Sequence, residues 1–169
     1  PAIRNLKWGG DAMDIKQVAV IGTGMMGPGI AAVVALAGYD VTLIGRQADR
    51  TEDCVKKAHA LMDQLLKNDL TTANAVARAK RAVSGTIALD SAVQGAQLVI
   101  ETISENLELK QQMFQRLDRL TSPEVILTTN TSGLSVTAIS ALATRRERIA
   151  TTHFWMPPYL IPLAEVVRS

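Results

Sequence analysis

The chain has 169 residues, of which 47% are hydrophobic, 20% are charged and only 4% are aromatic. This size and balance predict one globular domain with a core of aliphatic side chains. The net charge of +2, carried by scattered lysines and arginines, argues against nucleic acid or an anionic membrane surface as a partner. The longest apolar run, residues 30–37, is far too short to cross a membrane.

The start of the chain shows no hydrophobic periodicity. We interpret residues 1–15 as a tag remnant or a loose extension and residues 16–169 as the folded domain. From Lys16 onward, short apolar runs alternate with helical stretches: VAVI, then PGIAAVVALAG ending at Gly38, then VTLI. This strand–helix–strand rhythm is typical of a parallel sheet covered by helices, and Gly38 stands where helices commonly end in a left-handed residue.

Residues 51–80 contain two polar helical patterns separated near residues 68–72, which predict a helical pair inserted after the second strand. The single cysteine, Cys54, falls in the first of these helices. No Cys or His stands at metal-ligand spacing around it, so we predict a buried thiol rather than a nucleophile. One cysteine and the lack of a secretory pattern fit a reducing, cytoplasmic location.

Further apolar runs predict four more strands, at Val83–Ile87, Leu98–Glu101, Val125–Thr129 and Ile149–Phe154. The helices between them have readable starts: Ser104 precedes one with a periodic apolar face, and Ser135 is positioned to cap another that runs through Ala143. We therefore predict an α/β fold, with a Rossmann-type, doubly wound, mostly parallel sheet and the helical pair inserted after its second strand.

Three glycines, Gly22, Gly24 and Gly27, form the sequence G-T-G-M-M-G between the first strand and the first helix. In such a loop the first glycine permits a tight turn, the second lets the backbone approach a pyrophosphate, and the third lets helix and strand pack closely. Met25 and Met26 lead from the loop into a helix N-terminus that favours an anion. We interpret the loop as a dinucleotide-binding site; the alternative is a purely structural glycine turn.

The second strand ends in Gly45 and Arg46, where a dinucleotide-binding unit usually has an acidic residue for the ribose hydroxyls. An acidic residue repels a 2′-phosphate, whereas a guanidinium binds one in a bidentate manner. The pair therefore favours NADP. The alternative is a solvated arginine beside a turn glycine, with NAD bound through the remaining contacts.

Four stretches occur in order across residues 16–167: VAVIGTGMMGPGIA, IETISENLELKQQMF, TNTSGLSVTAI and HFWMPPYLIPLAEVV. Together they resemble the nucleotide-binding domain of the 3-hydroxyacyl-CoA dehydrogenase family. The resemblance implies an NAD-dependent dehydrogenase of fatty acid metabolism. It also implies a second, mainly helical C-terminal domain that completes the substrate site and usually a homodimer, and we expect that domain to be absent from this chain.

Oxidation of a secondary alcohol needs a base for the hydroxyl proton while hydride leaves carbon. His153 ends a predicted strand, where α/β sheets place their ligands, and Glu165 follows past a proline-rich turn. A carboxylate on the second ring nitrogen fixes the tautomer and favours the imidazolium as it forms. By resemblance these two residues match the family's catalytic His and Glu; the alternative is a hydrogen-bonded structural histidine.

The resemblance assigns three further residues. Ser132, in the sequence NTSG, matches the serine that hydrogen-bonds the substrate oxygen, with a turn or cap hydroxyl as the alternative. Glu105 and Lys110 match residues that contact the nicotinamide end of the cofactor. A glutamate at a helix N-terminus also complements the helix dipole.

Two positions depart from the family pattern: Met156 stands where an asparagine is usual, and Gly133 where a second serine is common. These departures bear on how the nicotinamide and a CoA thioester would be placed. We predict hydride transfer between NAD(P) and a small-molecule 3-hydroxyacyl substrate, by resemblance a CoA thioester. Two alternatives stay open: a dehydrogenase of free 3-hydroxy or sugar acids, and a non-catalytic nucleotide-binding or structural protein of the same fold.

Overall fold

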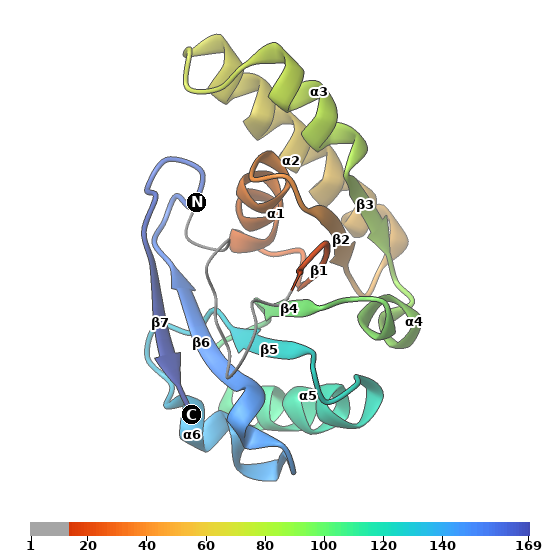
Figure 1. The fold of residues 1–169 in the computed structure, drawn as a ribbon, viewed down its shortest axis with the longest axis vertical. Helices are drawn as coiled ribbons and strands as arrows, with labels where there is room; N and C mark the ends of the chain where they lie inside the picture. Colours follow the sequence, from red (N-terminus) through yellow and green to blue (C-terminus); the bar gives the residue numbers. More distant parts are fainter. Residues whose placement is uncertain (1–13) are drawn as a thin grey trace.

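The computed structural model describes residues 14–169, so most of the predicted extension lies outside the described residues. Of the predicted extension, only residues 14 and 15 are described. Ile15 is buried in the hydrophobic core, so the folded domain begins at least one residue before its predicted start. The described residues form a seven-stranded sheet in the order β3-β2-β1-β4-β5-β6-β7 (Figure 1). The strands are β1 (Gln17–Ile21), β2 (Asp40–Ile44), β3 (Val83–Thr86), β4 (Leu98–Glu101), β5 (Ile126–Thr129), β6 (Ile149–Phe154) and β7 (Ala164–Arg168).

Strands β1 to β6 pair in parallel, and β7 pairs antiparallel along β6. The chain proceeds outward from β1 to β3 and then returns to β4 on the other side of β1, so the strand order reverses between β1 and β4. This confirms the predicted Rossmann-type, doubly wound arrangement. In such sheets ligands bind outside the carboxyl ends of the strands, at the point of reversal.

Helices cover both faces of the sheet (Figure 1). One face carries α1 (Met26–Leu36), α2 (Ala48–Lys67) and α3 (Ala73–Arg81), and the other carries α4 (Leu89–Gln94), α5 (Leu107–Leu120) and α6 (Val136–Ile139). Short 3-10 turns at Ser140–Leu142 and Arg146–Arg148 connect α6 to β6. Among residues 14–169, no helix combines the length and the apolar character that a membrane crossing needs.

Side chains alternate between the two faces along each strand, and this alternation builds two separate cores. In β1, Val18 and Val20 pack with the helices α1 to α3, whereas Ala19 and Ile21 pack with α4 to α6. Strands β4 and β5 are buried along their whole length. Such continuous burial is expected for parallel strands that are covered on both faces.

The predicted helix boundaries are largely confirmed. Gly38 has a φ of 104° just beyond the C-terminus of α1, and the helical pair α2–α3 follows β2 with its break at residues 68–72. Ser104 precedes α5, as predicted, and the structure adds the identity of its N-cap: Asn106, whose side chain accepts a hydrogen bond from the Leu109 amide. An asparagine offers the same kind of acceptor as a serine, so sequence alone does not choose between the two.

The short helices were harder to foresee. The structure adds α4, which buries only Val93 fully and has too few residues to show a periodic face. Ser135 caps α6 as predicted, but the α-helix gives way to a 3-10 turn after Ile139. The loop between β6 and β7 rests on α1: a Cβ on Gly29 would lie 2.6 Å from the ring of Pro158, so this helix position must be glycine.

A buried ion-pair cluster joins the end of α5 to the start of β6. Asp118 accepts hydrogen bonds from Arg148 at 2.6 Å and from Arg145 at 2.9 Å. Arg148, which is 2% exposed, also donates to the carbonyl oxygens of Ser122 and Val125. Burial alone would raise the pKa of Asp118, but the hydrogen bonds from Arg148 and from two backbone amides bring the pKa below its ordinary value.

We expect Asp118→Asn to lower the free energy of unfolding by about 3–5 kcal/mol at neutral pH, because the Arg148 guanidinium is then buried without its counter-charge. The loss should shrink in acid. The pKa of Asp118 in the folded state lies below the ordinary value of 3.8, so its contribution is present above that pH and disappears as the pH falls through the folded-state value. Urea unfolding from neutral to strongly acidic pH measures both effects.

Asp63→Asn is the matched control, since the ion pair of Asp63 with Lys80 lies largely in solvent. It should change the free energy of unfolding by less than about 1 kcal/mol. Equal losses in the two variants, or a loss in Asp118→Asn that persists unchanged in acid, would contradict a stabilising role for the buried cluster.

Candidate active site

The loop between β1 and α1 requires glycine at both ends. Gly22 has a φ of 119°, and a Cβ on Gly27 would lie 2.2 Å from the Gly22 carbonyl oxygen. A Cβ on Gly24 would meet no described atom within 4 Å, so this part of the loop is open to a ligand. The side chain of Met25 is exposed, whereas that of Met26 packs against the core. The first turn of α1 has no acidic residue and no side-chain cap within the described chain. This uncapped helix N-terminus suits a phosphate group.

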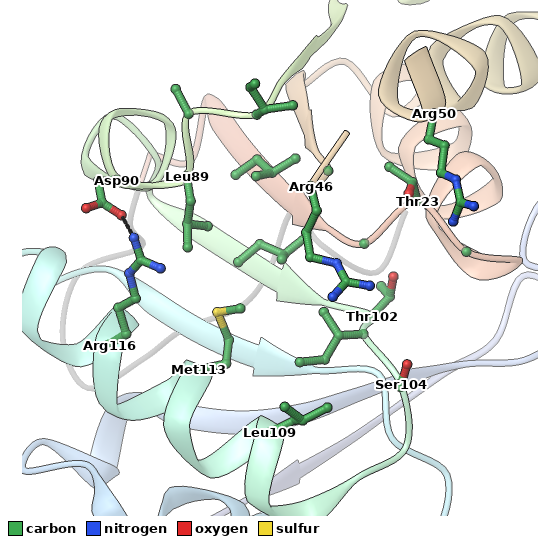
Figure 2. A pocket seen from close by; sticks show the side chains of 18 of the residues that line it. Thr23, Arg46, Arg50, Leu89, Asp90, Thr102, Ser104, Leu109, Met113 and Arg116 are labelled. Carbon is green, nitrogen blue, oxygen red and sulfur yellow. Dashed lines mark hydrogen bonds and ion pairs between the residues drawn. The ribbon is translucent and has the colours of Figure 1, made fainter. Parts of the chain in front are cut away.

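A cleft of about 1360 Å³ opens beside this loop, between the end of β2 and the helices α4 and α5 (Figure 2). Arg46 and Arg50 stand on its β2–α2 side, and the Arg46 side chain reaches across the cleft toward Thr102. The opposite wall is largely apolar and ends in an ion pair; it includes Leu89, Leu109, Met113 and the pair Arg116–Asp90. Cations on one side and an apolar wall on the other suit a phosphorylated nucleoside.

The position of Gly45, at the end of β2, has no room for a side chain. A Cβ there would lie 2.0 Å from Oγ1 of Thr51 and 2.8 Å from Cγ2 of Thr23. The Thr51 hydroxyl is held in place because it donates a hydrogen bond of 2.7 Å to the Gln47 carbonyl oxygen. The first turn of α2 therefore fills the space that an acidic side chain at this position would need, and Arg46 is the first residue after β2 whose side chain lines the cleft.

His153 and Glu165 face each other across the β6–β7 hairpin. They are directly opposed in the antiparallel register, and Nδ1 of His153 lies 2.8 Å from Oε2 of Glu165. The histidine side chain is 22% exposed and the glutamate side chain 52% exposed, so solvent and small molecules can reach the pair. With Nδ1 directed at the carboxylate, Nε2 is the nitrogen left for a ligand. The structure thus brings the two predicted residues together.

Asn130, which the sequence analysis did not single out, holds the backbone next to His153. The backbone N–H of Asn130 donates a hydrogen bond to the Glu101 carbonyl oxygen at 2.8 Å. Its side-chain Oδ1 accepts one from the backbone N–H of Phe154 at 2.8 Å. It therefore connects the ends of β4, β5 and β6. The signal in the sequence is weak: an asparagine directly after an apolar strand is also a common turn residue.

Glu105, from the turn before α5, holds the loop that carries Ser132. Thr131 Oγ1 and the Gly133 amide both donate hydrogen bonds to Glu105 Oε1, one from each side of the exposed Ser132. Burial alone would raise the pKa of Glu105, but the Thr131 hydrogen bond and the nearby Lys110 ammonium bring the pKa below its ordinary value. Glu105 is therefore a carboxylate near neutral pH.

Lys110 lies inside the protein. It is 1% exposed, and its Nζ is 2.8 and 3.0 Å from the two carboxylate oxygens of Glu101, which is itself 0% exposed. The same ammonium is 3.6 Å from Oε2 of Glu105. The sequence analysis did not single out Glu101; the only signal is a charged residue at the end of the otherwise apolar strand LVIE.

The predicted site residues fall into two groups at the carboxyl edge of the sheet. Gly22, Gly24 and Arg46 line the cleft, on the β1–β2 side of the reversal in strand order. The second group does not line that cleft. It follows β4, β5 and β6 along the chain: Glu105 and Lys110 in the turn after β4 and the first turns of α5, Ser132 after β5, His153 near the end of β6 and Glu165 opposite it on β7. The reversal separates the two groups as it separates the two mononucleotide-binding halves of such folds.

A family model and several relatives match this chain over most of its length. The family model described as 3-hydroxyacyl-CoA dehydrogenase, NAD binding domain, matches residues 17–169. The chain is 37% identical over 164 residues to the mitochondrial hydroxyacyl-coenzyme A dehydrogenase of Rattus norvegicus, a match that covers 92% of this chain and 51% of the relative. It is 38% identical over 156 residues to the 3-hydroxyadipyl-CoA dehydrogenase of Escherichia coli K12, covering 92% of this chain and 32% of that protein.

A solved structure shows the same similarity. The crystal structure of 3-hydroxybutyryl-CoA dehydrogenase from Escherichia coli K12 matches with a TM-score of 0.86 at 36% identity, covering 91% of this chain and 32% of that one. The chain thus spans about half, or less, of the length of the relatives that it matches.

The contact of Asn130 with the backbone beside His153 gives a direct test of how β6 is held. We expect Asn130→Ala to speed hydrogen exchange of the Phe154 amide by about two- to tenfold, because that amide loses an acceptor worth about 0.5–1.5 kcal/mol. Amide exchange followed by NMR measures it. Asn68→Ala is the control, since Asn68 bonds the Gln64 carbonyl oxygen at the far end of α2 and should leave the Phe154 amide unchanged. Equal exchange of Phe154 in all three proteins would contradict the proposed anchoring.

Proposed function

The chain belongs to the 3-hydroxyacyl-CoA dehydrogenase family, as its NAD-binding domain, and from this we propose that it transfers hydride between a nicotinamide dinucleotide and a 3-hydroxyacyl-CoA substrate. The observation that carries the proposal is the His153–Glu165 pair, 2.8 Å apart at the carboxyl edge of the sheet. A protein that only binds nucleotide has no chemical need for such a pair at this edge. The same geometry serves free 3-hydroxy acids, which the experiment below includes.

The residues present fit a dinucleotide. The glycine loop leaves an open surface at Gly24 before the uncapped N-terminus of α1, which suits a pyrophosphate. The adjoining cleft suits the adenosine half, and the group at the ends of β4 to β6 then lies toward the nicotinamide half. When bound, the nicotinamide supplies the hydride acceptor or donor.

His153 acts in this proposal as the general base for alcohol oxidation and as the general acid in reverse. Its Nδ1–H donates to Glu165, so Nε2 carries the lone pair that accepts the proton of the substrate hydroxyl. Glu165 holds the ring orientation and stabilises the imidazolium that forms. Ser132, exposed in the loop after β5, donates a hydrogen bond to the substrate oxygen in the same proposal.

The substrate side needs more enclosure than the described residues supply. Leu163 and Val167 are about half exposed on the β6–β7 hairpin, and Val167 lies on the same face of β7 as Glu165, because alternate residues of a strand point the same way. We place the further, mainly helical domain of the longer family members against this surface, where it would exclude water from the substrate and support a homodimer. Charge development in the transition state is stabilised more strongly in such a closed, dry site.

The cofactor preference proposed here is NADP over NAD. Gly45 cannot carry an acidic side chain because Thr51 occupies the space, so no carboxylate at this position repels a 2′-phosphate. Arg46 and Arg50 line the cleft on the same side and offer two guanidinium groups to that phosphate. The family model, by contrast, is described as NAD binding, so this preference would set the chain apart from its relatives.

We expect the chain to bind NADPH more tightly than NADH, and Arg46→Ala to remove about ten- to a hundredfold of NADPH affinity, the scale of a charge-assisted hydrogen bond of about 1.5–3 kcal/mol. Fluorescence titration of both cofactors measures it. Arg119→Ala is the matched control, because Arg119 lies on α5 and does not line the cleft. Equal binding of the two cofactors, or a preference for NADH that Arg46→Ala leaves unchanged, would refute the NADP assignment.

Replacing the proposed base should remove catalysis while leaving cofactor binding intact. We expect His153→Gln to lower kcat by about 10²- to 10⁴-fold, the usual contribution of general acid–base catalysis. The assay uses 3-hydroxybutyryl-CoA and free 3-hydroxybutyrate with each nicotinamide cofactor. It is run on this chain and, where the reading frame continues, on the longer polypeptide, which we expect to be far more active.

His59→Gln is the control, because His59 lies on α2, away from the carboxyl ends of β4 to β6. Activity that is indifferent to His153 would favour a non-catalytic nucleotide-binding role. Full turnover by the 169-residue chain alone would show that no further domain is needed to enclose the substrate.

A further inference from the structure

A pair of opposite charges is completely buried at the end of β4. Glu101 and Lys110 are 0% and 1% exposed, and both carboxylate oxygens lie within 3.0 Å of the Lys110 ammonium. Such a pair contributes little to stability as such, because desolvating two charges offsets most of their attraction, and apolar residues of similar size are often as stable. A role in geometry is therefore the better explanation of its presence beside the candidate site.

The Glu101 carboxylate is fully saturated by fixed groups. Oε1 accepts from the Ile103 amide at 2.5 Å in addition to Lys110, and Oε2 accepts from the Thr129 hydroxyl at 2.8 Å. These donors come from the turn after β4, from the end of β5 and from α5. One side chain thus fixes three elements relative to each other.

Two chains of contacts lead outward from Glu101 to the proposed catalytic groups. Through Lys110, the first reaches Oε2 of Glu105 at 3.6 Å, and Glu105 in turn bonds the loop on both sides of Ser132. The second begins at the Glu101 carbonyl oxygen, which accepts from the Asn130 amide at 2.8 Å. Asn130 then bonds the backbone directly after His153.

The Lys110 ammonium is buried and directed inward in this arrangement. Besides Glu101, it lies 3.4 Å from the Ile103 carbonyl oxygen and 3.5 Å from the Thr129 hydroxyl. Its two short contacts both go to Glu101, so a ligand could only replace the longer ones. The lysine therefore serves as the internal counter-charge of Glu101 and Glu105.

We propose that Glu101, through Lys110, is a positioning residue that sets the Glu105 carboxylate and the Ser132 and His153 loops for the nicotinamide half of the cofactor. The proposal rests on the proposed function, which places that half at the ends of β4 to β6. It predicts a larger effect on the nicotinamide half than on the adenosine half, because Glu105, Ser132 and His153 do not line the cleft, whereas of the groups that bond the Glu101 side chain only Ile103 does.

The experiment compares each dinucleotide with the same molecule lacking nicotinamide: NADPH with 2′-phospho-ADP-ribose, and NADH with ADP-ribose. We expect Glu101→Gln to weaken dinucleotide binding by about tenfold, the scale of one lost charge-assisted hydrogen bond. Binding of the matching ADP-ribose should change by only about twofold, because its proposed contacts at the glycine loop and Arg46 lie outside the Glu101 cluster and only the turn after β4, through Ile103, borders both. Calorimetric titration of the purified chain gives the dissociation constants of the dinucleotide and of the matching ADP-ribose. The ratio of these two constants is the readout.

Two further variants separate positioning from folding. Glu101→Leu combined with Lys110→Met removes both charges and should fold, because apolar replacements of a buried pair are tolerated, yet it should keep the altered ratio. Asp118→Asn breaks a comparable buried ion pair remote from the cleft and should lower stability without changing the ratio.

The outcomes distinguish the two proposals. A ratio unchanged in both Glu101 variants would overturn this inference and leave the proposed function standing. A ratio changed in the double variant but not in Glu101→Gln would also overturn it, because the effect would then come from the lysine itself. An unmodified chain that bound neither dinucleotide nor ADP-ribose would overturn the proposed function and this inference with it.

Discussion

The parallel pairing of β1 with β2 on one side and with β4 on the other is the constraint on which the rest of the structure depends. Because both pairings are parallel, the loops that follow these strands leave the sheet at one edge and diverge at the reversal. The glycine loop, the Arg46 turn and the Glu105 turn are therefore neighbours, although they are far apart in sequence. Two separate hydrophobic cores, one on each face, hold this edge rigid.

The single antiparallel strand adds what the parallel sheet cannot. Two parallel strands place their carboxyl ends at the same edge of the sheet, but the strands are joined by a long connection. Two residues only twelve positions apart in sequence can lie directly opposite each other only in an antiparallel hairpin. Strand β7 supplies it, and the register His153↔Glu165 brings imidazole and carboxylate to 2.8 Å. The hairpin loop is in turn seated on α1 where Gly29 leaves room for Pro158. The position of the candidate base therefore depends on the helix that begins at the phosphate loop.

Much of this organisation follows from local patterns in the sequence. Apolar runs predict six of the seven strands, the glycine spacing predicts the loop, and Gly38 predicts the end of α1, because each pattern reflects the conformation of nearby residues only. Helix α4 and the true cap of α5 escape such reasoning. The first is too short to show a period, and the second is one of two equally suitable polar residues.

By itself, then, the sequence determined the doubly wound fold, the dinucleotide-binding loop, the missing acidic residue after β2 and the residues His153, Glu165 and Ser132 as candidates. The tertiary structure alone decided which groups meet. It showed that Thr51 excludes any side chain at Gly45, that Lys110 points inward, and that Glu101 connects the loops of the candidate site. These are contacts between residues on different elements, and their distances depend on how the helices pack against the sheet, which no local pattern of residues encodes.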